Sequence, residues 1–324
     1  MISTEVLAND VLLNITGGSL GRCAVVPSDF LKGNVSQHVC ILRPIEILPQ
    51  YIHCFILSAH FSRFMKVTGS GREGLPKYSL EKMLIPIPPI KEQKRITNRI
   101  EEWMNKVIAI ENGVLSLQEK LERIKSLILE MAITGKLVPQ NPDDEPASIL
   151  LQKVNPNASV SADTSHYGQL PNGWCCCRLE DIVEYEQPQR YIVESTEYSD
   201  TYSTPVLTAG KSFIIGYTNE TNGIFSNLPV IIFDDFTTDS KYVDFPFKVK
   251  SSAMKILHVK NGVNIKYVYF FMSVTRLVGK THKRYWISEY SKLNIPLPPY
   301  NEQCRIVEAI ENINRRIDDI AEVL

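Results

Sequence analysis

The most regular hydrophobic pattern of the chain lies between residues 96 and 131. Apolar residues recur there at alternating intervals of four and three residues, and a second run with the same alternation covers residues 306–324. Such steps place the apolar side chains on one stripe of an α-helix, which is typical of helices that pair in a coiled coil. The two stripes consist of Ile96, Ile100, Trp103, Val107, Ile110, Val114, Leu117, Leu121, Ile124, Ile128 and Met131, and of Ile306, Ile310, Ile313, Ile317, Ile320 and Leu324.

Both helices follow the same proline-rich motif. Residues 85–96 read IPIPPIKEQKRI and residues 295–306 read IPLPPYNEQCRI, an ungapped repeat with an offset of 210 residues. Because proline fixes φ and disfavours helix in the residue before it, we expect an extended lead-in followed directly by a helix. Glu92 and Glu302 would lie in the first helical turn, where a carboxylate interacts favourably with the helix dipole. The repeat predicts two copies of one module, each ending in a long helix.

Shorter patterns between the helices predict strands. In the second module, apolar runs bounded by Gly, Asn and Asp predict strands at residues 182–185, 203–207, 212–217, 230–233 and 254–259, and a helix over residues 263–276 with Tyr267, Phe270, Phe271 and Val274 facing inward. In the first module, residues 10–15 and 37–42 match two of these strands, and residues 49–64 match the helix. Nothing there corresponds to residues 170–225, so we expect the first module to lack its opening portion.

These elements predict an α+β fold with two globular β-rich domains, joined and spaced by long helices that form an antiparallel coiled coil. The predicted parts are a first domain at residues 1–90, incomplete at its start, a long helix at 91–135, a linker with a short helix capped by Ser148 at 136–169, a second domain at 170–299, and a second helix at 300–324. We expect the shorter second helix to leave the first uncovered near Leu121–Met131 or its equivalent, where an exposed apolar stripe would bind a partner.

Composition narrows the class of protein. A length of 324 residues and a hydrophobic content of 44% fit two domains with cores of their own. No apolar run reaches the roughly 18 residues of a membrane span. The first residues, Met-Ile-Ser-Thr-Glu, lack the features of a signal peptide, so we expect a cytoplasmic protein without membrane contact. None of the seven cysteines forms a C-x₂-C pair, which favours buried, reduced thiols over a zinc site or a disulfide framework, and we predict no metal and no cofactor.

Charge is unevenly distributed along the second module. The net charge of −1 argues against nucleic-acid binding, yet residues 171–240 contain three basic and eleven acidic side chains, whereas residues 241–299 contain eleven basic and two acidic ones. Lys and Arg neutralise phosphates and read guanine edges, so the basic half is a candidate DNA face; a solvated basic loop is the alternative. The candidate contacts are Lys211, Lys241, Tyr242, Lys248, Lys250, Lys283, Arg284, Tyr285 and Trp286, with Arg22, Arg72 and Lys77 in the first module.

Taken together, these motifs resemble those of the specificity subunits of type I DNA restriction–modification systems. The resemblance covers nearly all residues after about Asp10. Its carriers are the twin Ile-Pro-x-Pro-Pro-x-x-Glu-Gln-x-Arg-Ile blocks, TGKL at residues 134–137, DDEPAS at residues 143–148 and LPNGW at residues 170–174.

The resemblance implies a division of labour. Two target-recognition domains would each bind half of a bipartite site in double-stranded DNA, and the paired helices would hold them a fixed distance apart. It implies that this chain is not an enzyme, because two modification subunits methylate adenine and restriction subunits translocate and cleave DNA. The alternatives are a truncated or phase-variable subunit with only one working half-site, or a coiled-coil scaffold that does not bind DNA.

Three short motifs resemble catalytic or phosphate-binding signatures. Leu297-Pro298-Pro299-Tyr300 resembles an amino-methyltransferase motif, but leucine cannot hydrogen-bond the target amine where that motif needs Asp or Asn. Asp239-Ser240-Lys241 matches half of a nuclease motif, without the upstream Pro-Asp. Residues 16–22 resemble a phosphate loop without the Gly-Lys-Ser/Thr ending, which favours a tight turn; the alternative is a turn in which Arg22 meets a DNA phosphate. We therefore predict no catalytic residues.

Overall fold

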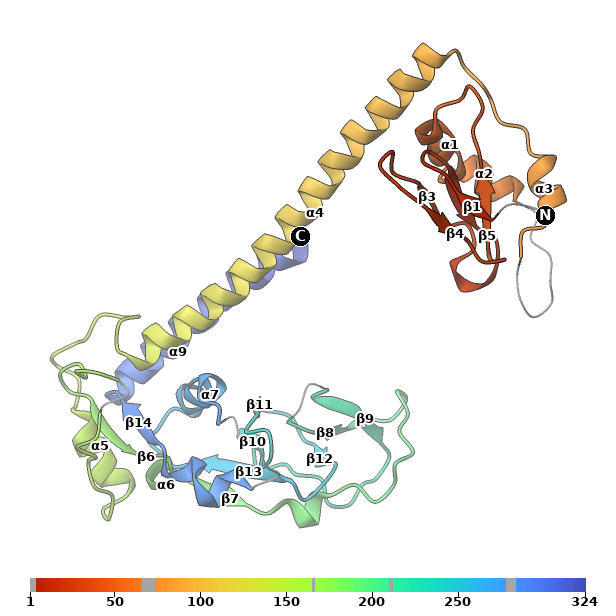
Figure 1. Cartoon of the computed structure of the whole chain (residues 1–324). Helices are drawn as coiled ribbons and strands as arrows, with labels where there is room; N and C mark the ends of the chain where they lie inside the picture. Colours follow the sequence, from red (N-terminus) through yellow and green to blue (C-terminus); the bar gives the residue numbers. More distant parts are fainter. Residues whose placement is uncertain (1–3, 66–73, 165–166, 210–211, 278–283) are drawn as a thin grey trace. The chain divides into compact units, whose positions relative to one another are not determined.

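The computed structural model describes residues 4–65, 74–164, 167–209, 212–277 and 284–324 (Figure 1). The chain forms two compact units, residues 1–115 and 116–324, and the division falls within the long helix α4 (Ile90–Ile133). None of the described helices is both long enough and apolar enough to cross a membrane.

Unit 1 is built on a small antiparallel sheet. Strand β2 lies between β3 and β5, and β1 pairs with β4. Alternation along β2 directs Val11 and Leu13 into a core that also contains Ile56, Phe61 and Leu75. The elements before α4 are β1 (Glu5–Val6), β2 (Val11–Asn14), η1 (Gly17–Ser19), β3 (Cys23–Val25), β4 (Gly33–Asn34), β5 (Val39–Leu42), α1 (Pro49–Ile56), α2 (Ala59–Phe64) and α3 (Lys77–Glu81).

The helix expected over residues 49–64 is two helices, α1 and α2. Ser58 precedes α2 as its N-cap, and its Oγ accepts a hydrogen bond at 3.3 Å from the backbone N–H of Phe61. A serine in this position satisfies one of the free donors at a helix start and thereby favours a new helix over continuation of the old one. The hydrophobic period alone does not reveal this break.

Unit 2 contains a four-stranded antiparallel sheet in the order β11-β10-β13-β7. A second sheet of β12, β8 and β9 lies beside it, and β14 pairs with β6. The elements are α5 (Ala147–Val154), β6 (Cys175–Arg178), α6 (Leu179–Ile182), β7 (Val183–Glu186), η2 (Pro188–Tyr191), β8 (Thr204–Leu207), β9 (Ile214–Thr218), β10 (Val230–Asp234), β11 (Ser240–Val243), β12 (Lys248–Val249), β13 (Met254–Val259), α7 (Ile265–Val274), α8 (Tyr285–Ser288), η3 (Tyr290–Lys292), β14 (Asn294–Leu297) and α9 (Tyr300–Val323).

Two apolar cores sit on opposite faces of the central strands. Along β10, Ile231 and Phe233 join the core that includes α7 and α9, whereas Val230 and Ile232 join the core beside the second sheet. The expected inward face of α7 is partly wrong, because Val274 is exposed. The helix buries Val268 and Met272 beside Tyr267 and Phe271, a wider stripe than the prediction. The expected cap of α5 is also wrong, since the helix starts one residue after Pro146.

Helices α4 and α9 pair antiparallel, as predicted. Figure 1 shows α9 starting beside the end of α4 and running back along it to the C-terminus. Leu121 and Ile128 of α4 share a core with Ile310 and Ile317 of α9, and Lys125 Nζ lies 3.1 Å from Asp318 Oδ1.

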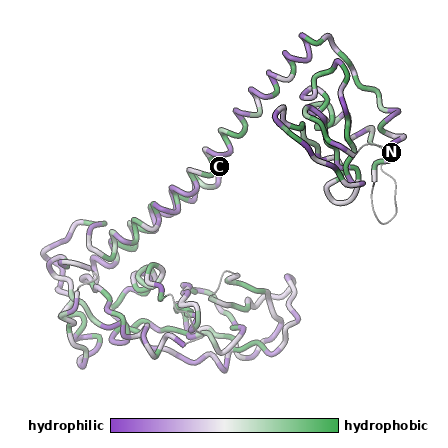
Figure 2. Tube along the Cα trace, viewed as in Figure 1, coloured by the Kyte–Doolittle hydropathy of each residue, from purple (hydrophilic) through white to green (hydrophobic). Residues whose placement is uncertain are grey.

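The position of the uncovered segment differs from the prediction. Leu121 and Ile128 are buried, so the stripe near Leu121–Met131 is largely covered, although Ile124 within it is exposed. Most exposed residues of the stripe lie earlier in α4, between Ile100 and Leu117. Antiparallel pairing explains the difference, because the first turns of α9 meet the last turns of α4. In Figure 2, hydrophobic residues recur along the whole of α4, including the part without α9 beside it.

Candidate nucleic-acid interface

The acidic and basic halves of the second module meet in the fold. Side chains that are far apart in sequence form ion pairs between the halves, with N–O distances of 2.8 Å for Lys248–Glu220, 3.5 Å for Lys255–Asp235, 3.7 Å for Lys260–Glu184 and 3.1 Å for Arg276–Asp239. The surface of the folded module is therefore less positively charged than the sequence of residues 241–299 suggests. Much of the positive charge between residues 241 and 299 neutralises the negative charge of residues 184–239.

Lys248 is one of these internal partners. Its side chain is buried, and Nζ donates a 2.7 Å hydrogen bond to the carbonyl of Asn222 besides contacting Glu220. Burial opposes ionisation of Glu220, but hydrogen bonds from Lys248 and from the N–H groups of Ser195 and Glu194 hold its pKa below the ordinary value. The prediction that Lys248 contacts DNA is wrong, because its side chain is buried and its ammonium group is held by Glu220 and the Asn222 carbonyl within the protein.

Tyr285 and Trp286 are also buried, in contrast to the predicted DNA face. The N–H of Tyr285 donates at 2.9 Å to the carbonyl of Asp235, and the N–H of Trp286 donates at 2.8 Å to the Asp235 carboxylate. The ring centroid of Trp286 lies 5.2 Å from that of Phe233. These aromatics anchor the chain to the sheet. They can position Arg284, the exposed residue immediately before them, but they cannot stack on a base themselves.

Tyr242 of β11 is half-buried and packs against α7. Its ring centroid lies 6.2 Å from that of Tyr269, and Lys266 Nζ lies 5.4 Å above the Tyr242 ring. Lys266 also forms an ion pair with Glu311 of α9. Burial raises the pKa of the Tyr242 hydroxyl, and the negative charge of Asp244 adds to this shift. The tyrosine therefore contributes to packing and has only part of its ring available to a ligand.

Three predicted basic residues remain available in unit 2. Lys250 and Arg284 are exposed and Lys241 is half-buried. Within the described part of the chain, none of the three forms an ion pair. Lys211 and Lys283 lie outside the described residues. The candidate site of unit 2 thus reduces to Lys241, Lys250 and Arg284.

In unit 1, the glycine-rich segment at residues 16–22 is a tight turn. Gly17 and Gly21 have φ values of 74° and 85°, which disfavour residues with a side chain. The side-chain amide of Asn14 donates to Ser19 Oγ at 2.8 Å across the turn, and Arg22 at its end is exposed. Lys77 is exposed and lies 3.3 Å from Glu81 in the same helix, a contact that solvent weakens. Arg72 lies outside the described residues.

The open apolar stripe of α4 is the second candidate surface. Its exposed members include Trp103, which is flanked by Arg99 at 5.5 Å and Lys106 at 4.9 Å from the ring centroid. Glu102 lies 2.7 Å from each of these cations. Apolar groups rimmed by charges are typical of protein–protein contacts. The exposed residues of the stripe from Ile100 to Leu117 are Ile100, Trp103, Val107, Ile110 and Leu117.

The motifs that resemble catalytic signatures have structural roles. Leu297 is buried in β14, and Asp239 pairs with Arg276.

The three consecutive cysteines of β6 are buried. Burial raises the thiol pKa of Cys175 to about 12 and that of Cys176 to about 11, and Cys177 is buried beside them. No metal-binding group of His, Cys, Asp and Glu side chains occurs among the residues that the structure describes.

Comparison with known sequences finds two matched regions. Residues 2–121 and 171–322 match the model of the family described as "Type I restriction modification DNA specificity domain". The EcoR124I/EcoR124II specificity subunit of Escherichia coli is 54% identical over 126 residues, which covers 37% of this chain and 31% of that protein. The chain therefore spans about a third of the length of this relative.

Comparison with solved structures extends the likeness over nearly the whole fold. A chain in a structure described as "Structural basis underlying complex assembly and conformational transition of the type I R-M system" matches with a TM-score of 0.71 and 16% identity, over 98% of this chain and 77% of that one. The HsdS subunit from Thermoanaerobacter tengcongensis matches with a TM-score of 0.56 and 17% identity, over 98% and 76% of the two chains. At these identities the likeness is one of fold.

Proposed function

The chain belongs to the type I restriction modification DNA specificity family, and from that premise we propose that it is a non-catalytic, sequence-specific DNA-binding subunit of a type I restriction–modification complex. In this role it directs two modification subunits and the restriction subunits to a bipartite site in double-stranded DNA. The observation that carries the proposal is the double match of the specificity domain to the two modules that the proline-rich repeat defines. Each module is assigned one half of the site.

In the second module, the proposed DNA contacts are the cations that the fold leaves available. Lys250 and Arg284 are exposed, and Lys241 is partly so. Buried Tyr285 and Trp286 support Arg284 from below, and a rigid support lowers the entropic cost of holding a cation against a phosphate or a base edge. Lys211 and Lys283 belong to the same proposal on sequence alone. Arg22, Lys77 and Arg72 are proposed for the first module.

A binding experiment tests this assignment. Duplexes selected from a randomised pool with the modification subunit present would supply the ligand, and the dissociation constant of the complex would be measured over a range of salt concentrations. If Lys250 and Arg284 each neutralise one phosphate, replacing both by alanine should weaken binding and flatten the salt slope by about two units. Lys153→Ala is the matched control, since Lys153 is an exposed lysine of α5 outside the proposed face.

Two results would contradict the proposal. An unchanged affinity and slope in the double variant would remove Lys250 and Arg284 from the interface. If the complex selects no duplex from the pool and its residual binding does not depend on salt, the alternative of a coiled-coil scaffold that does not bind DNA would be favoured.

For the partners, we propose that helices of a modification subunit cover the open stripe of α4. The stripe continues the face that α9 covers further along the same helix, because Leu121 follows Leu117 at the next four-residue step of the stripe. Replacing Val107 and Ile110 by aspartate should therefore prevent assembly with the modification subunit while the free chain keeps its fold. Co-elution of the double variant with the modification subunit at the wild-type ratio would contradict the assignment.

A further inference from the structure

The turn after the central strand has the same hydrogen-bonded frame in both units. Strand β2 ends at Asn14 and β10 ends at Asp234, and each of these residues pairs with the first residue of a neighbouring strand, β5 or β13. The N–H of Asn14 donates to the carbonyl of Arg22 at 2.8 Å, and the N–H of Asp234 donates to that of Asp239 at 2.9 Å. The turn is longer in unit 1, but it is closed at the same place.

Two further segments meet each turn at equivalent positions. Ile15 accepts a backbone hydrogen bond from the N–H of Leu75 at 2.8 Å and donates one to the carbonyl of His38 at 2.9 Å. The equivalent residues of unit 2, with distances of 2.9 and 3.0 Å, are Asp235, Tyr285 and Ala253. Side chains around the two turns can therefore be compared position by position.

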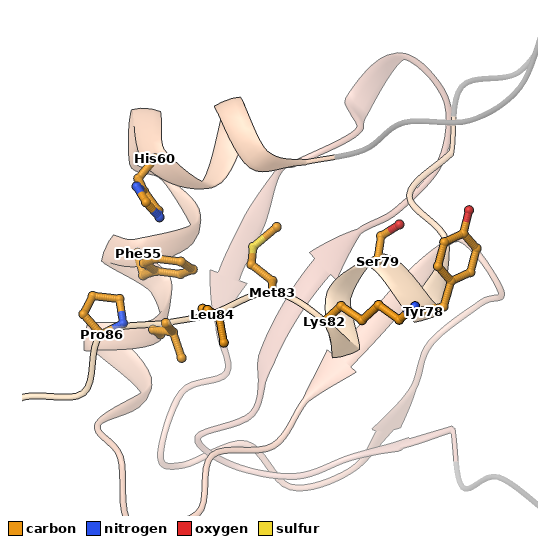
Figure 3. A pocket seen from close by; sticks show the side chains of 9 residues that line it. Phe55, His60, Tyr78, Ser79, Lys82, Met83, Leu84 and Pro86 are labelled. Atoms are coloured by element: carbon orange, nitrogen blue, oxygen red, sulfur yellow. The ribbon is translucent and has the colours of Figure 1, made fainter.

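In unit 1, the segment that meets the turn continues into α3. This helix and the residues after it pack on the core through Leu80 and Met83. Figure 3 shows Tyr78 of the helix on the other side of a pocket from Phe55. None of the residues that line this pocket belongs to the turn. The packing that holds the frame and the exposed surface of the frame are therefore separate parts of unit 1.

The frame of unit 1 carries a chain of polar side chains. Thr16 Oγ1 lies 2.7 Å from His38 Nδ1, and His38 Nε2 lies 3.4 Å from the amide nitrogen of Gln37. Because an amide nitrogen only donates, His38 Nε2 accepts, and Nδ1 carries the proton that is donated to Thr16. Gln37 and His38 are exposed, beside a hollow of about 350 Å³ that Asn14, Thr16 and Ser19 help to line. The exposed amide of Gln37 is thereby oriented.

In unit 2, the frame carries an apolar and a cationic side chain instead. Phe236 accompanies Asp234 as Thr16 accompanies Asn14, since each donates its N–H to the side chain two residues earlier, at 2.8 and 3.1 Å. Phe236 is 40% exposed. Arg284 is exposed as well, and it directly precedes the residue that is hydrogen-bonded to the turn. The two side chains therefore flank one backbone contact.

The turn of unit 2 also holds a strained residue. Thr238 has a φ of 58°, in the left-handed region that the equivalent Gly21 occupies at 85°. A β-branched side chain disfavours this conformation. Thr238 is buried, and its hydroxyl accepts a hydrogen bond from the N–H of Leu277 at 3.2 Å, so the surrounding structure holds it in place. Strain of this kind is concentrated at sites that bind ligands.

We propose that this frame is the base-reading surface of each module, and that the two modules read different chemical groups. In the first module, Gln37 contacts an adenine in the major groove, where its Oε1 accepts from N6 and its Nε2 donates to N7. In the second module, Phe236 contacts the methyl group of a thymine.

The neighbouring cations support this assignment, which rests on the proposed DNA recognition. Arg22 closes the turn of unit 1 and is exposed, and Arg284 flanks Phe236 in unit 2. Contacts to phosphates fix the position of a protein on the duplex, whereas contacts to base edges carry the sequence information. Gln37 and Phe236 are uncharged and supply the second kind of contact.

The test uses the full chain with the modification subunit and the duplex selected from the randomised pool. Each thymine is replaced in turn by uracil, which lacks only the methyl group, and each adenine by 7-deazaadenine, which lacks the N7 acceptor. We expect the wild type to lose about fivefold or more in affinity at one thymine and at one adenine, in opposite halves of the site.

The variants assign these losses to residues. Phe236→Ala should abolish the sensitivity to uracil and keep that to 7-deazaadenine, and Gln37→Ala should do the reverse. Both should keep the salt slope of the wild type, because neither removes a charge. Ile149→Ala is the control, since Ile149 is an exposed apolar residue of α5, outside both frames. Phe236→Leu keeps an apolar side chain and should retain part of the uracil sensitivity.

Three results would overturn the inference. They are a wild type that is insensitive to both base replacements, variants that keep the sensitivities of the wild type, and loss of both sensitivities in either variant. If the wild type binds the selected duplex with its salt slope and one of these results is found, this inference fails alone. If the complex selects no duplex, the proposed function fails and the inference fails with it.

Discussion

Helices α4 and α9 start from the same motif and carry the same apolar stripe, but they differ in what covers them. Ile310 of α9 is fully buried, whereas Ile100, the same position of the repeat in α4, is 39% exposed. Ile317 is 5% exposed and its equivalent Val107 is 43% exposed. The sequence of the stripe therefore does not determine whether its residues are buried. A packed neighbour covers these positions in α9, and the same positions in α4 form an open surface that a partner can use.

The segments before the two helices differ in the same way. Glu302 is buried and receives hydrogen bonds from Trp174 and from Gln140. Asp144 accepts from Arg305 at 2.7 Å, and this contact lowers the pKa of the Asp144 carboxyl. In α4, the residues at the Glu302 and Arg305 positions pair with each other instead. We call the start of each long helix, with the residues that contact it, a joint. The same sequence motif thus forms a closed joint in unit 2, where Glu302 is buried, and an open joint in unit 1, where Glu92 is partly exposed.

The largest effect should distinguish the covered and open stripes. Ile310→Ala should lower the free energy of unfolding by about 2–5 kcal/mol, because it removes a fully buried side chain and leaves a cavity. Ile100→Ala, at the same position of the repeat, should change it by no more than about 0.5 kcal/mol in the free chain. Urea denaturation followed by tryptophan fluorescence measures both. Equal losses in the two variants would show that the stripes are equally packed.

A smaller effect should distinguish the two joints. Glu302→Ala leaves the buried indole N–H of Trp174 without an acceptor, so we expect a loss of about 1–3 kcal/mol. Glu92→Ala removes only a contact near the surface and should cost about 1 kcal/mol or less. The same denaturation measurement applies. A loss for Glu92→Ala as large as that for Glu302→Ala would contradict an open joint in unit 1.

The smallest effect is a pH dependence confined to the closed joint. Burial raises the pKa of Glu302 above its ordinary value of 4.5, although Gln140 and Trp174 donate to it. The folded state therefore binds more protons than the unfolded state just above pH 4.5, and its stability falls as the pH rises through this range. Glu302→Gln stays neutral and should remove that part of the fall. Parallel stability curves for the two proteins from pH 4 to pH 7 would show that Glu302 does not titrate as proposed.

Much of the local structure could be predicted from the sequence. The helix expected over residues 91–135 is α4 at Ile90–Ile133, and the strand expected at residues 254–259 is β13 with the same bounds. These predictions succeed because period and proline position are local properties of the chain. The repeat also predicts equivalent helix starts, which the matching contacts of Gln93 and Gln303 confirm.

The site could be predicted less well, because it depends on contacts between distant residues. From the sequence alone, Lys248 is interpreted as a free cation, but in the structure it forms an ion pair with Glu220. From the sequence alone, Trp286 is interpreted as a surface on which a base could stack, but in the structure it packs against Phe233 and is hydrogen-bonded to Asp235. An acidic residue directly after a buried strand, as Asp235 follows β10, is the one sequence signal that could have suggested an anchor. The position of the open half of α4 could be predicted only from the direction and register of α9.

The most direct test concerns the proposed role of α4 as the spacer between the two halves of the DNA site. Repeating residues 107–113 after Gly113 keeps the heptad register and lengthens the helix by about 10 Å, which corresponds to about three base pairs of DNA. A seven-residue insertion after Asn157, in the linker outside both long helices, is the control. Selection from a randomised duplex pool should return sites with a spacer about three base pairs longer for the helix insertion and an unchanged spacer for the control. An unchanged spacer in the lengthened protein would contradict the account.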